Sequence, residues 1–397
     1  MTTYTRLLRD REVRALLTSS AVLVAGNSLT GLALATLVNT ATGSSLLTAL
    51  SLFGPTLAQL LGGSALMSLA DTGRPRRVLA LSQASAALCA LAQLPAGLPV
   101  GVRLGLVLLT GLLASVSGGV RYGLLSEAVG VEGYAAARSL LNVSTGAMQI
   151  AGFGSGAILL AWFTPQHLFG ITAGVLALST IGILTGVRDR SSRPVTRPGV
   201  RQTVRTNRWL FRQPALRPLL LNAWLPNGLI VGCEALFVPY AGPRAGALFV
   251  AAAVGMLCGD LIVGRFLSRG RRARLGSWLR VLLAAPYLLF WFRPEIPPAV
   301  LLVAVASVGF AGTLPLQERI LALTPPATRG QVQGVEGAGR MAMQGVCALT
   351  AGALAELLPT ATVMTLLAGV SLLVTVCSMR ALRRAGSSRH GRKRPTR

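Results

Sequence analysis

The sequence predicts an all-α membrane protein of twelve transmembrane helices, arranged as two six-helix halves with both termini in the cytoplasm. Three observations carry this prediction: the composition, the length of the apolar segments and the placement of the arginines. Of the 397 residues, 52% are hydrophobic and only 13% are charged, and the mean hydropathy is +0.61. A soluble domain has about a quarter charged residues. Most of this chain is therefore not expected to face water.

The apolar segments have the length of membrane spans. A helix needs about 20 apolar residues to cross a bilayer core of about 30 Å. In the first half such segments are residues 15–38, 44–70, 78–93, 104–128, 139–163 and 168–187. In the second half they are residues 219–241, 245–264, 275–292, 298–323, 335–358 and 361–381. The third and ninth segments are the shortest, and each has a charged or proline-rich edge.

A polar stretch separates the two sets of spans. Residues 188–217 contain nine arginines and three prolines and almost no apolar run. We therefore expect an N-terminal six-helix bundle over residues 1–187, a cytoplasmic linker over 188–217, a second bundle over 218–381 and a basic cytoplasmic tail over 382–397. The charged N-terminus leads directly into a full-length span, so we expect no cleavable signal peptide.

Basic residues fall almost entirely on one side of the predicted membrane. If the N-terminus is cytoplasmic, 32 of the 38 basic residues lie on the inner side and three, Arg103, Arg244 and Arg293, on the outer side. Lys and Arg in short loops mark the cytoplasmic face, which predicts a multi-pass protein of the plasma membrane. The net charge of +26 is thereby explained without nucleic acid, and no nucleic-acid partner is expected.

Residue types that build metal or catalytic sites are scarce. All five cysteines fall within apolar segments, and the two histidines are far apart in sequence. Neither a phosphate-binding loop of the Gly-x-x-x-x-Gly-Lys-Ser/Thr type nor a catalytic triad is visible. We expect no enzyme, no metal and no cofactor.

The two halves resemble each other at an offset of about 197 residues. The segment from Met67 to Arg77, after the second span, lies over the segment from Gly264 to Arg272, after the eighth. Each has a small or acidic residue at the end of the span, then a tight turn, then clustered arginines. Met148-Gln149 in span five likewise resembles Met343-Gln344 in span eleven. Repeats of equal topology joined by a linker are typical of transporters whose halves rock about a central site.

These loops resemble the signature of the major facilitator superfamily, Gly-x-x-x-Asp-Arg-x-Gly-Arg-Arg, and the resemblance covers essentially the whole chain. The first copy departs from it at Met67, Thr72 and Gly73. The second has Ser268 in place of the acid and a turn that is one residue shorter. The residues that match, or that stand at the signature positions, are Asp71, Arg76, Arg77, Gly264, Ser268, Arg269, Arg271 and Arg272. The resemblance implies that Asp71 contacts the start of span eleven, residues 334–340, and locks an outward-facing state. The arginines either hold the cytoplasmic helix ends together or serve only as topology anchors.

Ionisable groups within spans are costly and mark functional sites. Glu234 lies about three quarters along span seven, away from the cytoplasmic arginines. We expect it to be a proton or cationic-substrate site, or else a carboxyl neutralised by hydrogen bonds near the outer interface. Asp260, near the inner end of span eight, is expected to form a structural or gating ion pair, with proton coupling as the alternative.

Charges in spans four, ten and eleven suggest further pairs. Arg121 falls at the repeat position of Gln317 and Glu318. The fourth and tenth helices line the cavity in the fold that the chain resembles, and the resemblance therefore implies Arg121 and Glu318 as candidates for an interdomain charge pair. Alternatively, Arg121 binds an anionic substrate, or Glu318 pairs with Arg319. Glu336 and Arg340 have the i, i+4 spacing of an ion pair on one helix face. Amide side chains inside spans either contact substrate or stabilise helix packing; those placed in the candidate cavity are Asn27, Asn227, Gln149 and Gln344.

The favoured functional hypothesis is a bacterial secondary transporter that exports a small drug-like or secondary-metabolite compound in exchange for protons. Gly146, Gly152, Gly154 and Gly156 give span five a small-residue face. Related drug/proton antiporters combine such glycines with a Gly-Pro pair, which this span lacks. The alternatives are uptake of a small metabolite or organic anion and a transport-inactive membrane receptor or scaffold. The expected partners are a small-molecule substrate, protons and the lipid bilayer, and the expected state is a monomer.

Overall fold

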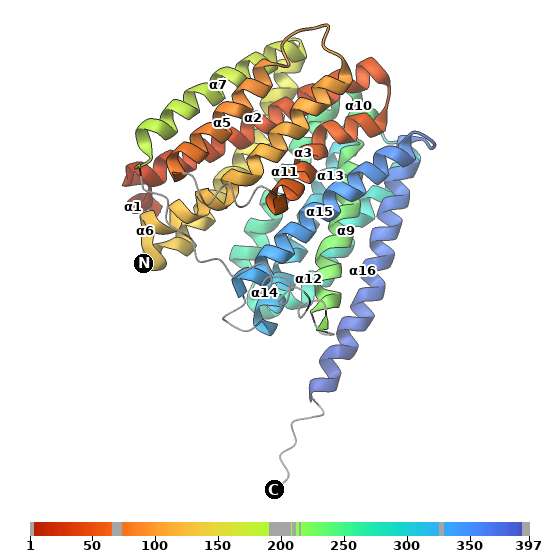
Figure 1. Cartoon of the computed structure of the whole chain (residues 1–397). Coiled ribbons are helices and arrows are strands. Elements are labelled where there is room, and N and C mark those ends of the chain that lie inside the picture. Colours follow the sequence, from red (N-terminus) through yellow and green to blue (C-terminus); the bar gives the residue numbers. More distant parts are fainter. Residues whose placement is uncertain are drawn as a thin grey trace. The chain divides into compact units, whose positions relative to one another are not determined.

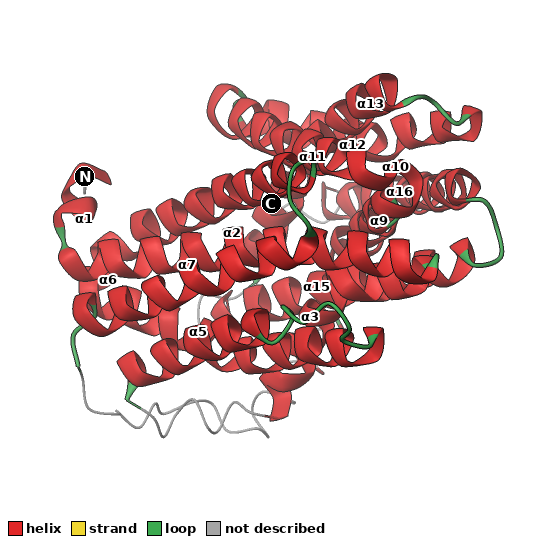
Figure 2. Ribbon diagram, turned by 90° about the horizontal axis from the view of Figure 1, so that it is seen from above, coloured by secondary structure: helices red, strands yellow, loops and turns green. Residues whose placement is uncertain are grey.

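The computed structural model describes residues 4–65, 74–189, 208, 212–213, 216–324 and 329–390, and within these ranges every regular element is a helix (Figures 1 and 2). The chain divides into two compact units. Unit 1 comprises Met1–Thr196 and Phe237–Ala253, and unit 2 comprises Arg197–Leu236 and Val254–Arg397. The all-α class that the sequence predicts is confirmed for the described residues. The predicted boundaries at residues 188–217 fall mostly outside them and stay a prediction.

Unit 1 is built from long helices. They are α1 (Tyr4–Arg9), α2 (Arg11–Thr42), α3 (Ser45–Ala65), α5 (Pro75–Leu91), α6 (Val100–Leu160) and α7 (Pro165–Gly186). The short helix α10 (Phe237–Ala241), the 3-10 turn η1 (Gly242–Arg244) and the first part of α11 (Ala245–Leu261) complete the unit. Helices α2, α5 and α7 lie side by side (Figure 1).

Local chemistry fixes both ends of α2. The Asp10 carboxylate accepts hydrogen bonds from the backbone N–H groups of Glu12, at 2.8 Å, and Val13, at 3.1 Å. Such a cap satisfies N–H groups that have no partner within the helix. Gly43 ends the helix in a left-handed conformation, with φ of 65°, which glycine adopts without steric cost.

Helix α6 corrects one expectation from the sequence. It continues from Val100 to Leu160, through residues 129–138, where a loop between spans four and five was expected. The segment Val129–Arg138 contains no proline, and its three consecutive alanines favour a helix, although Gly130 and Gly133 weaken it. Two apolar stretches, Val100–Val129 and Val143–Leu160, still meet the length and hydropathy of separate spans.

Arg103, one of the three arginines expected on the outer side, is buried, with 1% of its surface exposed. It donates to the carbonyl oxygens of Gln93 at 2.7 Å, Pro95 at 2.6 Å and Leu98 at 3.1 Å. Gln93 Nε2 in turn donates to the Arg103 carbonyl at 3.0 Å. A single guanidinium therefore satisfies the carbonyls of the α5–α6 connection, which has no regular structure of its own.

Unit 2 has shorter and more often interrupted helices. After α9 (Arg217–Ala235) and the rest of α11 come the π-helical segment η2 (Ile262–Phe266), α12 (Arg269–Ala284) and the 3-10 segment η3 (Ala285–Phe292). The unit continues with α13 (Ile296–Val308), the 3-10 segment η4 (Gly309–Gly312), α14 (Thr313–Leu323), α15 (Arg329–Ala355) and α16 (Thr360–His390). Pro286 lies at the start of η3, where its ring cannot continue an α-helix.

Nine segments of the described chain are long and apolar enough to cross a membrane. One of them, Arg217–Leu261, covers the predicted spans seven and eight. Helices α5 and α15 lie where spans three and eleven were expected, but they are not among the nine. Several transmembrane helices are thus supported, while the number twelve and the side on which the termini lie stay predictions.

Glycine allows close helix contacts in both units. A Cβ atom added at Gly62 would lie 2.9 Å from the Leu112 carbonyl oxygen, and one at Gly259 would lie 2.5 Å from that of Val308. The predicted small-residue face of span five is confirmed for three of its four glycines: Gly152 and Gly156 approach α2, and Gly154 approaches Val250. Gly146 has no neighbour within 4 Å among the described residues.

Candidate functional site

Glu234 lies in the last turn of α9, next to a break in the chain's helical path. The helix ends at Ala235, Leu236 is the C-cap residue, and α10 begins at Phe237. The carboxylate is half-buried, and within the described part of the chain it forms no hydrogen bond or ion pair. The predicted acid in span seven is therefore placed inside the bundle without a bound counter-charge.

Tyr287 is the polar neighbour of Glu234 that sequence reasoning missed. It belongs to η3, is fully buried and interacts electrostatically with the Glu234 carboxylate. Its hydroxyl has no hydrogen-bond partner among the described residues. A tyrosine following Pro286 inside an otherwise apolar run was the available signal. The phenol is a hydrogen-bond donor and the carboxylate an acceptor, but no hydrogen bond joins the two groups in the described part of the chain.

Contacts with α15 and α16 hold α9 in place. Trp224 Nε1 donates to the Glu336 carbonyl at 2.9 Å, and Cys233 Sγ donates to the Met364 carbonyl at 3.4 Å. Pro226 sits inside α9 and removes one helix hydrogen bond, while Ser371 Oγ donates to the Pro226 carbonyl at 3.0 Å. The acid is thus presented by a helix anchored on two sides.

The four amide candidates divide between the units. In unit 2, Asn227 is buried and its Nδ2 has no hydrogen-bond partner in the described part, and Gln344 is half-buried. In unit 1, Asn27 on α2 and Gln149 on α6 are exposed. Asn227 has the unmet hydrogen-bonding capacity that a polar ligand would use. The substrate contacts of all four stay predictions.

Arg280 is a second residue that sequence reasoning missed. It lies on α12 with 5% of its surface exposed, donates through Nη1 to Asn222 Oδ1 on α9, and donates through Nε to the Gly276 carbonyl at 3.2 Å. It falls within the predicted span over residues 275–292, but it is one of the 32 basic residues counted on the inner side. Its flanking residues, Leu279 and Val281, were the signal that it lies within a span. The structure therefore places a guanidinium inside unit 2 among neutral acceptors.

Of the first arginine loop, residues 67–77, the structure describes residues 74–77, where α5 begins. Asp71, the candidate gate, falls outside the described residues. Arg76 forms an ion pair with Asp189 at 3.2 Å and donates to the Leu184 carbonyl at 3.2 Å, and Arg74 reaches the same carboxylate at 3.3 Å. Arg77 is exposed. Arg76 therefore connects the start of α5 to the end of α7. Its partner Asp189 lies between two linker arginines in the sequence, and its pairing was not predicted.

In the second arginine loop, residues 264–272, Arg272 lies in the first turn of α12 and contacts α14. Arg272 forms an ion pair with Glu318 at 2.8 Å and donates to the Leu267 carbonyl at 3.0 Å. Glu318 thus pairs with Arg272, whereas Arg121 and Arg319 were the predicted partners. Ser268 is the N-cap residue of α12 but makes no side-chain cap hydrogen bond, and Arg271 is exposed. For Gly264 and Arg269 the structure describes the backbone only, within η2 and at the start of α12.

Four other charged candidates lie outside these two loops. Arg121 on α6 is half-buried, and its Nε lacks a hydrogen-bond partner among the described residues. Asp260 on α11 has a buried Oδ1 that accepts no hydrogen bond from the described chain. Glu336 and Arg340 form the expected i, i+4 ion pair at 3.4 Å, with a contact geometry that is not a hydrogen bond. The proposed Arg121–Glu318 pair and the ion pair of Asp260 stay predictions.

Comparison with solved structures identifies transporters of the same fold. The nucleoside transporter NupG aligns with a TM-score of 0.71 and 13% identity, over 93% of this chain and 98% of that one. A bacterial homolog of the human lysosomal transporter Spinster gives 0.66 and 13%, over 94% and 95%. A POT family transporter in complex with a thioalcohol-conjugated peptide gives 0.71 and 9%, over 92% and 95%. No protein-family model and no curated protein sequence matches the chain.

Proposed function

The chain has the fold of the major facilitator superfamily, and on that premise we propose that it is a secondary active transporter that works by alternating access. The observation that carries this proposal is the fold match over nearly the full length of both chains. The matched proteins take substrates as different as nucleosides and peptides, so the fold does not select the substrate.

We further propose that the transporter exports a small, partly hydrophobic compound in exchange for protons. Glu234 supports coupling because a carboxyl group inside a bundle, beside a buried phenol and without an ion pair in the described chain, can change its protonation during a transport cycle. The scarcity of charged residues within the spans favours a substrate with large apolar surface.

The positive-inside asymmetry supports the proposed orientation, with both termini cytoplasmic in a bacterial plasma membrane. The face of unit 1 that carries Arg11, Arg76 and Asp189 is then the cytoplasmic face. The gating roles of Asp71 and of the two arginine loops belong to the same proposal.

The decisive experiment measures substrate-driven proton movement in proteoliposomes. Ethidium, a hydrophobic cation, serves as the probe, and a pH-sensitive dye reports the lumen. We expect the wild-type protein to move protons against ethidium and Glu234→Gln to lose this coupling while still exchanging ethidium across the membrane. Glu295→Gln is the matched control, because Glu295 is an exposed acid at the start of α13 in the same unit. Equal proton movement in both variants would remove Glu234 from the mechanism.

One observation favours a second candidate, transport of a small organic anion. The buried Nε of Arg121 lacks a hydrogen-bond partner in the described chain, and a guanidinium fits a carboxylate. Radiolabelled salicylate tests this reading: uptake that Arg121→Gln abolishes, without any ethidium transport by the wild type, would replace the export proposal. A wild-type protein that binds these compounds and transports none of them would instead be a receptor.

A further inference from the structure

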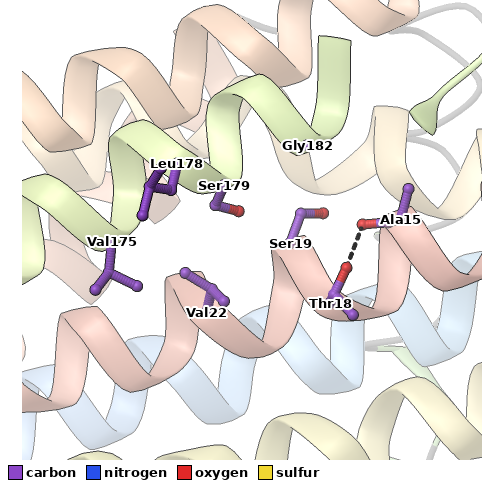
Figure 3. A pocket seen from close by; sticks show the side chains of 8 residues that line it. All are labelled: Ala15, Thr18, Ser19, Val22, Val175, Leu178, Ser179 and Gly182. Carbon is purple, nitrogen blue, oxygen red and sulfur yellow. Dashed lines mark hydrogen bonds between the residues drawn. The ribbon is translucent and has the colours of Figure 1, made fainter. Parts of the chain in front are cut away.

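Two helical paths of unit 2 are interrupted where they meet α12. In unit 1, by contrast, α2 and α7 run unbroken along the two sides of a surface groove of about 300 Å³ (Figure 3). In unit 2, Pro226 lies inside α9 and removes the hydrogen bond that the Asn222 carbonyl accepts in a regular helix. The path from α13 to α14 is interrupted by η4. Helices bend most easily at such points.

The sequence explains the interruption at η4. Pro315 has no N–H group, so an α-helix cannot continue by bonding this residue to the Ala311 carbonyl. Gly309 and Gly312 of η4 are three residues apart and share one face, because a 3-10 helix has three residues per turn. Both pack closely against α12, and a Cβ atom added at Gly309 would lie 2.3 Å from the Leu283 nitrogen. A short 3-10 stretch within a helix often marks a hinge.

Arg280 of α12 contacts both interruptions. Its Nη1 donates to Asn222 Oδ1, one helical turn before Pro226. Its side-chain stem packs on η4, where a Cβ atom added at Gly312 would lie 2.9 Å from Arg280 Cγ. The guanidinium is buried, and its hydrogen-bond partners in the described chain are all neutral. One buried side chain therefore links the points at which the two helical paths can bend.

The helical parts next to these points pack against each other. Helix α14 lies beside both α9 and α12 (Figure 1). Residues 217–225 of α9, α14 and the start of α15 contribute to one buried apolar cluster, which includes Leu219, Leu220, Ala223, Leu316, Ile320 and Val332. Separating α9 from α14 would expose these side chains to solvent or lipid. The two parts are therefore expected to move together.

An ion pair connects α14 to α12 at a second place. Arg272 Nη1 lies 2.8 Å from Glu318 Oε1, and the two side chains are 24% and 31% exposed. Ion pairs with this exposure contribute little to stability. This connection can therefore open and re-form, whereas the contacts of Arg280 are buried.

We propose that residues 217–225 of α9, α14 and the start of α15 form one mobile block, which turns about Arg280 as its pivot and is held closed by the Arg272–Glu318 pair. Arg280 is then a positioning residue that fixes the axis of the movement. The movement takes place within unit 2. Its use as a gate rests on the proposed transport function, whereas the movement itself does not.

Distances between spin labels on the full-length protein in nanodiscs test the movement directly. Labels at the exposed positions Arg217, Arg319 and Arg271 report on α9, α14 and α12, and an introduced unnatural amino acid carries each label. We expect Glu318→Gln to raise the populations with longer α12–α14 and α12–α9 distances about two- to fivefold, the factor that a half-exposed ion pair contributes. The α9–α14 distance should stay unchanged. Glu295→Gln, at an exposed acid next to α13, is the matched control and should shift no population.

The opposite partner of the ion pair gives an independent variant. Arg272→Gln should shift the same two distances as Glu318→Gln, so the test does not depend on the folding of one variant. Unchanged distances in both variants would show that unit 2 is rigid and overturn the proposal. A change of the α12–α14 distance alone would also overturn it, because α9 would then not move with α14.

The double variant Arg280→Met, Asn222→Leu tests the pivot. We expect the distribution of α12–α9 distances to become at least about twofold wider, because the hydrogen bond between the two helices is lost. The α9–α14 distribution should keep its width, since the buried cluster is intact. Arg274→Met, at an exposed arginine of the same helix, is the matched control. Wild-type widths in the double variant would exclude Arg280 as the pivot. A protein that shows all these movements and transports no compound would contradict the proposed function alone.

Discussion

Both units pack their second span against their fourth through glycine, and then they diverge. Gly62 meets the Leu112 carbonyl in unit 1, and Gly259, which lies 197 residues later, meets the Val308 carbonyl in unit 2. In unit 1 the partner helix α6 continues without interruption. In unit 2 the corresponding helix changes to the 3-10 segment η4 directly after Val308. A shared contact thus supports two different backbones.

The buried polar groups of unit 2 lie at or beside its interrupted helices. Tyr287 lies in the 3-10 segment η3, and Glu234 lies one residue before the end of α9. Arg280 packs against η4, where a Cβ at Gly312 would lie 2.9 Å from its Cγ. In unit 1 the buried Arg103 sits at a helix start and is saturated by carbonyls. Discontinuous helices form the substrate and ion sites of many transporters. Under the proposed function, we therefore expect the acid chemistry in unit 2 and a purely structural role for the buried arginine of unit 1.

The largest expected effect comes from destroying the shared contact. Gly62→Leu and Gly259→Leu each place a side chain against a backbone carbonyl, which cannot move without shifting a helix. We expect each variant to lose about 3 kcal/mol or more of stability, measured as the loss of monodisperse protein after heating. If the two contacts are equivalent, the two losses are similar.

Matched controls distinguish this clash from the mere addition of a leucine. Gly174 in unit 1 and Gly369 in unit 2 have no neighbour within 4 Å of an added Cβ in the described chain. Gly174→Leu and Gly369→Leu should therefore keep the wild-type melting temperature. If only Gly259→Leu strongly lowers stability, the two glycine contacts are not equivalent in energy, although they stand at repeat positions in the sequence.

The second largest effect is expected at the buried Arg103 of unit 1. Arg103→Ala leaves the carbonyls of Gln93, Pro95 and Leu98 without donors. We expect a loss of about 2–3 kcal/mol, because buried acceptors without partners are costly, and unchanged transport per folded molecule. Arg244→Ala, at an exposed arginine in the same unit, should change neither quantity. Thermal melting and proteoliposome transport measure the two, and a transport defect that exceeds the loss of folded protein would contradict a purely structural role.

Features that depend on many residues, or on a single helix, can be predicted from this sequence, whereas contacts between separate helices cannot. Apolar length and arginine placement predict helices and membrane spans, because these are averages over many residues. The i, i+4 pair of Glu336 and Arg340 is predictable because one helix sets the geometry. The ion pair of Arg76 with Asp189 was not predictable, because the two residues are far apart in sequence and only the packing of separate helices brings them together. The same holds for Tyr287, which is buried within range of the charge on Glu234. Arg280 was counted on the inner side because it is the last of six arginines in residues 265–280, and only the structure shows that it is buried.

A smaller stability effect, with a larger functional one, is expected at Arg280. The double variant Arg280→Met, Asn222→Leu replaces both partners of a buried hydrogen bond with apolar groups, and such replacements can be nearly neutral or stabilising. We expect stability within about 1 kcal/mol of the wild type. Because an ionisable group inside a span is a functional candidate, we also expect transport to fall at least tenfold. Arg103→Met should show the opposite pattern, with stability lost and transport retained. If both arginine replacements only destabilise the protein, the division of roles between the units is wrong.

The smallest effects are expected at the two arginine loops, where the units can be compared pair by pair. Arg76 and Asp189 are 29% and 30% exposed, and Arg272 and Glu318 are 24% and 31% exposed. Such pairs contribute about 0.2–1 kcal/mol each. Double-mutant cycles with Arg76→Gln and Asp189→Asn, and with Arg272→Gln and Glu318→Gln, measure both coupling energies by thermal melting. We expect the stronger coupling in unit 2, because the Arg272 contact is shorter, at 2.8 Å against 3.2 Å. Both arginines also bond a backbone carbonyl, Arg76 that of Leu184 and Arg272 that of Leu267, and in unit 1 Arg74 also reaches Asp189. A coupling in unit 1 equal to or larger than that in unit 2 would show that the length of the contact does not set its strength.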